Sequence, residues 1–448
     1  MRFPIVLAAT LAAALLVVAC GGDSSPEPPP ATEAPAAARE VVEDDHADGD
    51  DHAEDDHAHD DHMVASAGAG RIIVSDAESP YVSVIDLSTG FVARGAFEVA
   101  APAATVYSGL DGRYAFVLSR GPGDADDRIH VFDSGIYTVP HGDHEDLVID
   151  PVARLLDVAD ELPIHYTSLH GWVAVFADSH GHVFLFEEEG LAAGRHGYEP
   201  RILEAGPHHG SAVALAGDRF IVSTKNPDNA DDPLPVGVEV RDLNDNVIYD
   251  DSNRSCPGLH GEAHSAPGVM FGCVGGVLLF QQDGDTLSHV FIQNPEEMLE
   301  NARVGRVYGH HEAGTFFVTA SYRTEQGWGQ DGLWFIDPAN GAFTRVMDES
   351  ASASFGPHGE RFLVFTTDGV LHVFEAATGE FVTKAALVGP GAERPPAMTF
   401  VGEDLVITDP AKGLVRRVSL DTFSTVAEWE VGGTPASLAF VGLAGDSH

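Results

Sequence analysis

The hydrophobic pattern of the chain changes at Arg71 and then stays constant to the end. Short runs of β-branched and aromatic residues alternate with clusters of glycine, aspartate, proline and asparagine. Such runs, bounded by turn-forming residues, predict β-strands. We therefore expect an all-β domain over residues 66–448.

A loose repeat of about 47 residues runs through this domain, a length in the range of β-propeller blades. Each unit consists of a first strand, a turn, an apolar second strand, a turn and a third strand. Eight second strands can be recognised, beginning at Ile72, Tyr114, Val173, Phe220, Val269, Phe316, Phe362 and Leu405. Third strands follow, beginning at Val82, Ile129, His182, Val238, Gly276, Leu333, Leu371 and Leu414. The expected fold is a β-propeller of eight blades, with seven as the alternative count.

The two ends of the repeat region complement each other. The first unit begins directly at a second strand, whereas the segment 435–441 resembles a first strand with no second strand after it. We expect this C-terminal strand to complete the first blade and close the ring, which would leave no open sheet edge.

The N-terminus predicts export. Residues 1–20 have a positive start at Arg2 and an apolar core, 5–18, that is too short to span a bilayer. Val17-Val18-Ala19-Cys20 resembles a bacterial lipobox, so Cys20 is the expected lipidation site. Ordinary signal cleavage nearby is the alternative. The expected location is the periplasm, with any membrane contact made through a lipid anchor.

Two segments of low complexity follow the leader. Residues 21–40 are rich in Gly, Ser, Pro, Ala and Glu, a composition typical of a flexible tether. Residues 41–65 form a His/Asp-rich arm that we expect to be disordered and to bind metal. Its histidines are His46, His52, His57, His59 and His62. The alternative is a solvated acidic segment without a specific function.

Charge and cysteine content narrow the possible partners. With 24 Lys and Arg against 70 Asp and Glu, the formal net charge is −46. Nucleic acids and anionic membrane surfaces require a basic patch, so neither is an expected partner. Cys256 and Cys273 are expected to form a disulfide in an oxidising compartment. Any metal would then be held by histidines and carboxylates.

Histidines concentrate where first strands begin, the positions that face the axis of a propeller. Those on four successive units are His165, His208, His209, His260, His264, His310 and His311, and His141, Asp143 and His144 precede them. Glu145, Glu262 and Glu312 are adjacent. Imidazole and carboxylate ligands suit zinc, so we expect a Zn2+ site formed by a subset of these residues. Each histidine alone could instead be a turn residue bonded to the backbone.

Other histidines carry a simpler interpretation. His358 and His170 occupy turns between first and second strands, although His170 remains a marginal ligand candidate. His130, His182 and His372 lie on third strands and are expected to belong to strand surfaces far from the axis.

Taken together, these motifs resemble the periplasmic zinc metallochaperones of the AztD type. The similarity rests on the exported leader, the His/Asp arm and the motifs Pro140-His-Gly-Asp-His144, Pro207-His-His-Gly210, Leu259-His-Gly-Glu-Ala-His264 and Gly309-His-His-Glu312. It implies a protein that acquires zinc and passes it to the solute-binding protein of a zinc ABC importer. The lipobox is a departure if the relatives are freely soluble.

Two other functions remain open from the sequence. A metal-dependent hydrolase would also use three histidines with an open coordination position. A surface interaction module would carry the histidines incidentally. Neither explains the arm and the axial histidines together, so we expect zinc handling and no enzymatic activity.

Overall fold

The structure is a computed structural model that describes residues 69–121, 127–142, 144–193, 197–229, 231–325, 327–390 and 394–443. The chain divides into two units, Met1–His62 and Met63–His448, and every described residue lies in the second. The expected signal peptide (1–20) with Cys20, the tether (21–40) and the arm (41–65) with its five histidines lie outside the described residues. Asp143 does so too.

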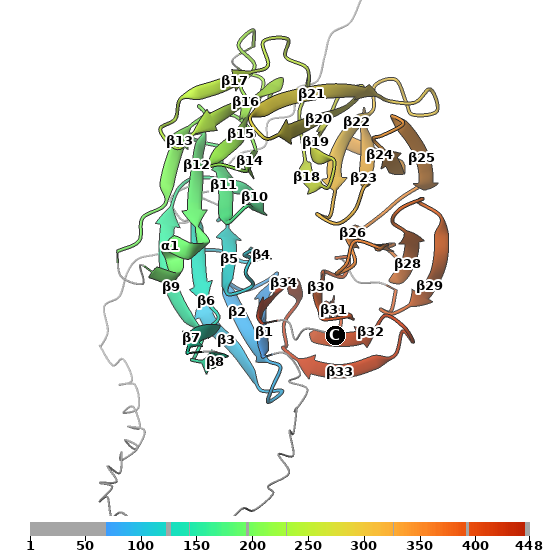
Figure 1. Cartoon of the computed structure of the whole chain (residues 1–448). Coiled ribbons are helices and arrows are strands. Elements are labelled where there is room, and N and C mark those ends of the chain that lie inside the picture. Colours follow the sequence, from blue (N-terminus) through green and yellow to red (C-terminus); the bar gives the residue numbers. More distant parts are fainter. Residues whose placement is uncertain are drawn as a thin grey trace, which may run out of the picture. The chain divides into compact units, whose positions relative to one another are not determined.

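Eight four-stranded antiparallel sheets make up the described part of the chain, arranged around a common centre (Figure 1). The expected all-β fold is confirmed, and its architecture is consistent with a β-propeller. The first four sheets, in strand order, are β34 (Pro435–Gly442), β1 (Gly70–Asp76), β2 (Tyr81–Asp86), β3 (Val92–Glu98); β4 (Thr105–Ser108), β5 (Tyr114–Ser119), β6 (Arg128–Asp133), β9 (Ala153–Ala159); β10 (Pro163–Leu169), β11 (Trp172–Ala177), β12 (His182–Glu187), β13 (Arg201–Glu204); and β14 (Ala212–Leu215), β15 (Arg219–Thr224), β16 (Gly237–Asp242), β17 (Val247–Asp250).

The other four sheets follow the same order. They are β18 (Glu262–Ser265), β19 (Gly268–Cys273), β20 (Gly276–Asp283), β21 (Thr286–Gln293); β22 (Arg303–Tyr308), β23 (Phe316–Thr324), β24 (Gly327–Asp337), β25 (Ala342–Met347); β26 (Ser352–Phe355), β27 (Arg361–Phe365), β28 (Val370–Glu375), β29 (Phe381–Ala386); and β30 (Met398–Val401), β31 (Asp404–Asp409), β32 (Leu414–Ser419), β33 (Thr425–Glu430). Strands such as β10, β18 and β30 lie toward the middle in Figure 1, whereas β17, β21, β29 and β33 lie outside.

The second strand of each sheet contains one of the predicted apolar runs. Strands β5 and β11 are buried along their whole length, because each sheet packs against a neighbour on both faces. The outer strands β29 and β33 alternate between exposed and half-buried residues, as is typical of strands with one solvent-exposed face.

Aromatic side chains from neighbouring sheets meet in the core. Phe116 of β5 meets Phe186 of β12 edge to face, with ring centroids 5.3 Å apart. Between another pair of neighbouring sheets, Phe317 of β23 stacks on Phe362 of β27, with ring centroids 3.9 Å apart. These contacts fix neighbouring sheets relative to one another.

The last strand of the described residues pairs with the first of them. Strand β34 runs antiparallel to β1, and the register extends from Gly70 opposite Gly442 to Asp76 opposite Pro435. A segment near the C-terminus therefore shares a sheet with the start of the described chain.

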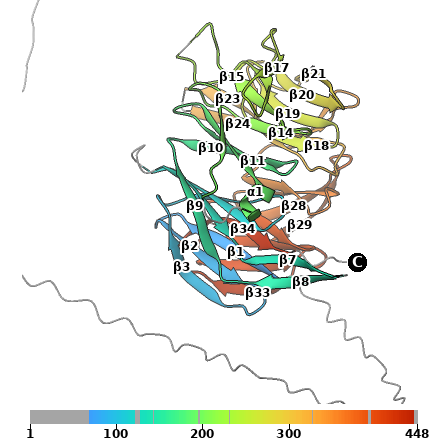
Figure 2. The same ribbon diagram turned by 60° about the vertical axis from the view of Figure 1, so that its left-hand side comes forward.

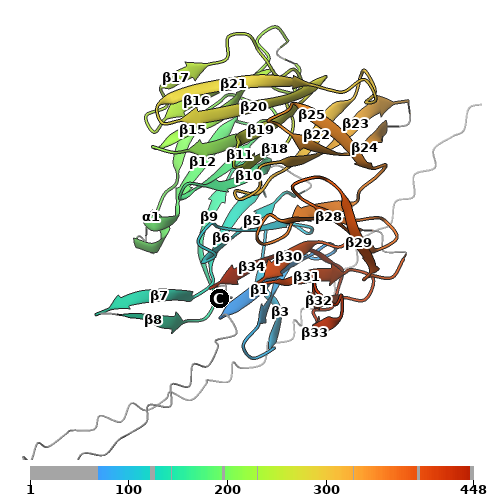
Figure 3. The same ribbon diagram turned by 45° about the vertical axis from the view of Figure 1, so that its right-hand side comes forward.

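A two-stranded hairpin interrupts the regular order. Strands β7 (Ile136–His141) and β8 (His144–Ile149) are inserted between the third and fourth strands of one sheet and project from it (Figures 2 and 3). Helix α1 (Glu188–Ala193) has six residues, and no helix in the described ranges is long and apolar enough to cross a membrane.

Candidate metal centre

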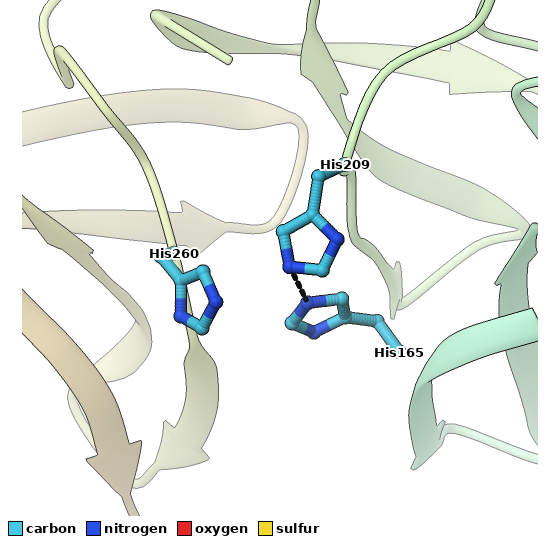
Figure 4. A group of neighbouring side chains, drawn as sticks. All are labelled: His165, His209 and His260. Carbon is cyan, nitrogen blue, oxygen red and sulfur yellow. Dashed lines mark hydrogen bonds between the residues drawn. The ribbon is translucent and has the colours of Figure 1, made fainter. Parts of the chain in front are cut away.

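Three histidines from different segments of the chain converge on one point, and we call them the axial group. His165 lies on β10, His209 on the connection between β13 and β14, and His260 just before β18 (Figure 4). One ring nitrogen of each lies within 4.8 Å of those of the other two. The Nε2 atoms of His165 and His209 are 3.3 Å apart. The sequence placed all three on the axis but did not predict that they form one group.

The opposite nitrogen of each ring is held by an acceptor. Nδ1 of His209 lies 2.6 Å from a carboxylate oxygen of Asp178, and Nδ1 of His165 lies 3.1 Å from Glu262. Nδ1 of His260 donates to the backbone carbonyl of Gly305 at 2.7 Å. A carbonyl or ionised carboxylate can only accept, so each Nδ1 carries a proton. In the neutral rings, the three Nε2 lone pairs are therefore directed toward one another.

Local backbone features place two of these side chains. The β10–β11 register shifts between Pro163 and His165, and such an irregularity re-aims a side chain at the end of a strand. Gly261 follows His260 with φ +78°, and a Cβ there would lie 2.8 Å from the Gly305 carbonyl oxygen. Only glycine lets the chain pass close enough for His260 to bond this same carbonyl.

The pKa values of His260 and His165 are shifted in opposite directions. Burial, partly offset by the bond to Gly305, lowers the pKa of His260 to about 4 and keeps this ring neutral. Burial also disfavours charge on His165, but the Glu262 carboxylate outweighs it and raises the pKa of His165 above its ordinary value. A protonated His165 can donate from Nε2 to His209, so a proton competes for the place where a metal would bind.

Two carboxylate oxygens beside the group could each accept a further hydrogen bond or bind a cation. Oδ1 of Asp178 and Oε2 of Glu262 are buried and have no hydrogen-bond partner among the described residues. Buried polar atoms without partners are uncommon and call for an explanation. Both atoms belong to the carboxylates that orient His209 and His165, so negative potential is concentrated where a cation would lie.

A second group of histidines lines a cavity of about 550 Å³ next to the first group. Glu262 is a lining residue too, so one side chain contacts both groups. The histidines that line the cavity are His170, His264, His310 and His311. Burial, with neighbouring His170 and His311, lowers the pKa of His264 to about 4. His310, His311 and Glu312 also bring ligand atoms within 4.8 Å of one another.

His170 reaches this cavity through a strained turn. It precedes Gly171 in the two-residue connection between β10 and β11, and both residues have positive φ, 53° and 79°. Such a turn matches the twist of a hairpin and is usually occupied by Asn or Gly in its first position. The predicted turn assignment of His170 is correct, and its side chain nevertheless lines the cavity.

Other predicted ligands lie elsewhere. His208 is buried with both ring nitrogens engaged, Nδ1 by the carbonyl of Gly206 and Nε2 by the hydroxyl of Ser223, each at 2.8 Å. His141 and His144 lie on the projecting hairpin, where they form a separate exposed group with Asp146. The structure does not bring these three histidines to the axial group.

The sequence missed one further group of metal-ligating type. Asp160, His180 and His182 bring ligand atoms within 4.8 Å of one another. His182 was expected to lie on a strand surface. The spacing His180-Gly-His182 was the available signal, but its carboxylate partner is distant along the chain.

The chain was compared with known protein families, curated proteins and solved structures. No family model matches the chain. It is 26% identical over 392 residues to the zinc chaperone AztD of Citrobacter koseri, which covers 85% of this chain and 88% of that protein. The crystal structure of Citrobacter koseri AztD matches with a TM-score of 0.71 and 25% identity, over 85% of this chain and 100% of that one. The structure of the apo form gives the same score over 99% of its length. The predicted resemblance is confirmed.

Proposed function

We propose, from the similarity to zinc chaperone AztD together with the three convergent histidines, that this chain is a non-enzymatic zinc metallochaperone of the periplasm. It acquires zinc and transfers it to the solute-binding protein of a zinc ABC importer. The observation that carries the proposal is the arrangement of His165, His209 and His260, whose Nδ1 atoms are all engaged and whose Nε2 atoms face one another.

The spacing of these nitrogens suits zinc. Zn–N bonds of about 2.0–2.1 Å at tetrahedral angles place two ligand nitrogens about 3.3 Å apart. The Nε2 atoms of His165 and His209 are 3.3 Å apart in the structure, so this distance would not have to change for both to bind one zinc ion. Asp178 and Glu262 would serve as the outer acceptors that fix the tautomers of these rings and raise their basicity.

Three protein ligands leave a fourth coordination position for an incoming group. In an enzyme this position would hold an activated water. In a chaperone, a ligand from the acceptor protein would bind zinc at this fourth position, and ligands of the acceptor would then replace the histidines one after another. Zinc would therefore not be released to solvent. We propose the second mode, with the acceptor docking near the adjacent cavity.

The cavity offers further ligands along such a route. Glu262 contacts His165 on one side and lines the cavity on the other. We propose that zinc moving from the three-histidine group meets the free oxygen of Glu262 and then the imidazoles of His264, His310 and His311. The low pKa of His264 keeps that ring neutral and able to bind metal.

The N-terminal segments fit the same role. We propose that the leader exports the chain, that Cys20 carries a lipid anchor, and that the arm histidines collect zinc and hold it loosely. A flexible multidentate segment captures ions quickly, whereas a preorganised site retains them. These assignments rest on the sequence.

We further propose that each four-stranded sheet is one blade of an eight-bladed propeller closed by β34. The pairing of β34 with β1 supports closure, because it removes the edge that β1 would otherwise expose. A ring closed in this way would hold the axial histidines at fixed separations.

The test is a zinc titration of the full chain against competing chelators, followed by transfer to the apo solute-binding protein of the same organism. We expect one tightly held zinc that is lost in the His209→Ala and His260→Ala variants and retained in His372→Ala, a histidine on β28. Replacing the five arm histidines with alanine should remove only weaker sites. Transfer should continue with a chelator present, and zinc that reaches the acceptor only through the free pool would overturn the proposal.

A further inference from the structure

A compact group of two imidazoles and one carboxylate lies apart from the axial histidines. Asp160 lies in the connection between β9 and β10, His180 in the turn between β11 and β12, and His182 at the start of β12. Nδ1 of His180 lies 2.6 Å from one oxygen of Asp160, and Nδ1 of His182 lies 2.5 Å from the other. One carboxylate thus anchors two rings, which stack at 5.3 Å.

The backbone forces the two rings to share this carboxylate. Gly181 lies between them with φ +70°, and a Cβ there would overlap the backbone carbonyl of Gly206. A tight turn with glycine at this position therefore projects both flanking histidines toward Asp160. The Asp160 side chain is 5% exposed, so its charge has little solvent to stabilise it.

The second nitrogen of His182 also has an acceptor. Glu204 of β13 lies opposite His182 in the strand register, and its carboxylate is 3.4 Å from Nε2. Histidines that bind metal through one nitrogen usually donate the other N–H to a carboxylate or carbonyl. The group therefore contains three ligand atoms within 4.8 Å of one another and an outer acceptor for one ring.

We propose that Asp160, His180 and His182 form an additional binding site for a divalent cation of the zinc type, with Glu204 orienting His182. The cation takes the place of the protons that Asp160 shares with the two Nδ1 atoms. Two imidazoles and a carboxylate are a ligand set that zinc accepts, and His180 is 52% exposed, so ions can enter from solvent. The choice of zinc as the ion rests on the proposed function, whereas the site itself does not.

The position of this site connects it to the axial group. The turn that carries His180 also carries Asp178, which orients His209. One short segment thus contacts His209 and also carries His180, so an ion bound at the exposed site lies beside the turn that orients one of the three axial histidines.

The experiment is histidine footprinting with diethyl pyrocarbonate and mass spectrometry on the full chain at buffered free zinc. The reagent requires a free nitrogen lone pair. Zinc on Nδ1 leaves the proton on Nε2, so a bound ring cannot react. We expect zinc to protect His180 and His182 with a common midpoint, while His372 reacts unchanged. Asp160→Asn removes a charged ligand and should therefore raise that midpoint by at least the roughly tenfold that loss of an outer carboxylate costs. The matched control Asp348→Asn, whose side chain is 96% exposed, should not raise it.

The outcomes separate this inference from the proposed function. Protection of His165, His209 and His260 with no protection of His180 and His182 would overturn the additional site and leave the chaperone proposal intact. Protection of His180 and His182 in the His209→Ala variant as well would support an independent site. Zinc protection that is unchanged by Asp160→Asn would also overturn the inference, because the proposed ligand set requires this carboxylate.

Discussion

Replacing Asp178 with asparagine tests whether tautomer control sets the zinc affinity of the axial group. In the native chain, Nδ1–H of His209 donates to the Asp178 carboxylate at 2.6 Å. Asparagine has nearly the same shape, but its amide group can donate a hydrogen bond to Nδ1. The ring would then carry its proton on Nε2, where it blocks the lone pair that must bind zinc.

The size of the effect follows from the role of this contact. Losing an outer carboxylate that orients a ligating histidine typically costs about 10–100-fold in metal affinity. That range corresponds to about 1.4–2.7 kcal/mol in binding free energy. The Oδ1 atom of Asp178 is buried without a described partner, so water cannot readily restore the lost acceptor. We therefore expect Asp178→Asn to fall toward the upper end of the range.

The assay is a competitive zinc titration with a chelator strong enough to empty the weaker sites. Asp348→Asn serves as the control, because it removes the same charge from a side chain that is 96% exposed. A loss of affinity in Asp178→Asn alone supports the reasoning. Equal affinities in Asp178→Asn and the native chain would refute it, because His209 would then bind zinc without help from this carboxylate.

Three further predictions follow from the same structure. Glu262 raises the pKa of His165, so protons compete with zinc increasingly as pH falls, and affinity measured from about pH 7.5 to about 5.5 should decline steeply. The Cys256→Ser/Cys273→Ser double variant opens a covalent loop with a sequence separation of 17 and should lower the free energy of unfolding by about 3 kcal/mol, measured by denaturant titration. The His141→Ala/His144→Ala double variant should leave tight zinc binding unchanged in the chelator assay, because both side chains lie on the projecting hairpin.

Each of these three predictions would be contradicted by a specific result. A flat zinc affinity across that pH range would exclude a histidine centre. An unchanged denaturation midpoint in the cysteine variant would mean that the cross-link adds no stability. Loss of the tight zinc in the hairpin variant would move the centre away from the axis and onto β7 and β8.

The strand pattern predicted most of the fold, because a strand that is buried on both faces appears in the sequence as a continuous run of apolar residues. Segments such as 114–118 and 173–176 are continuous apolar runs, and they lie in the wholly buried strands β5 and β11. The hairpin β7–β8 was not predicted, because its strands are mostly exposed and neither contains the continuous apolar run of a strand buried on both faces. Its histidines therefore appeared to be part of a connection leading to the axis.

The candidate site was predicted only as a set of positions. Alignment of the repeats placed His208 and His209 together, but adjacent side chains point in different directions, and only His209 reaches the axial group. Which histidine faces inward depends on local turns such as the one at Gly261. The group at Asp160 was missed because it depends on a contact between residues about twenty positions apart.

The disulfide between Cys256 and Cys273 encloses the segment that supplies His260, Glu262 and His264. Cytosolic chains keep such thiols reduced, whereas exported chains can oxidise them. A newly made chain still in the cytoplasm would therefore carry this loop without its covalent brace. Under the proposed function, the cross-link would tie maturation of this loop to secretion, so that His260, Glu262 and His264 gain their covalent brace only in the compartment where zinc is to be acquired.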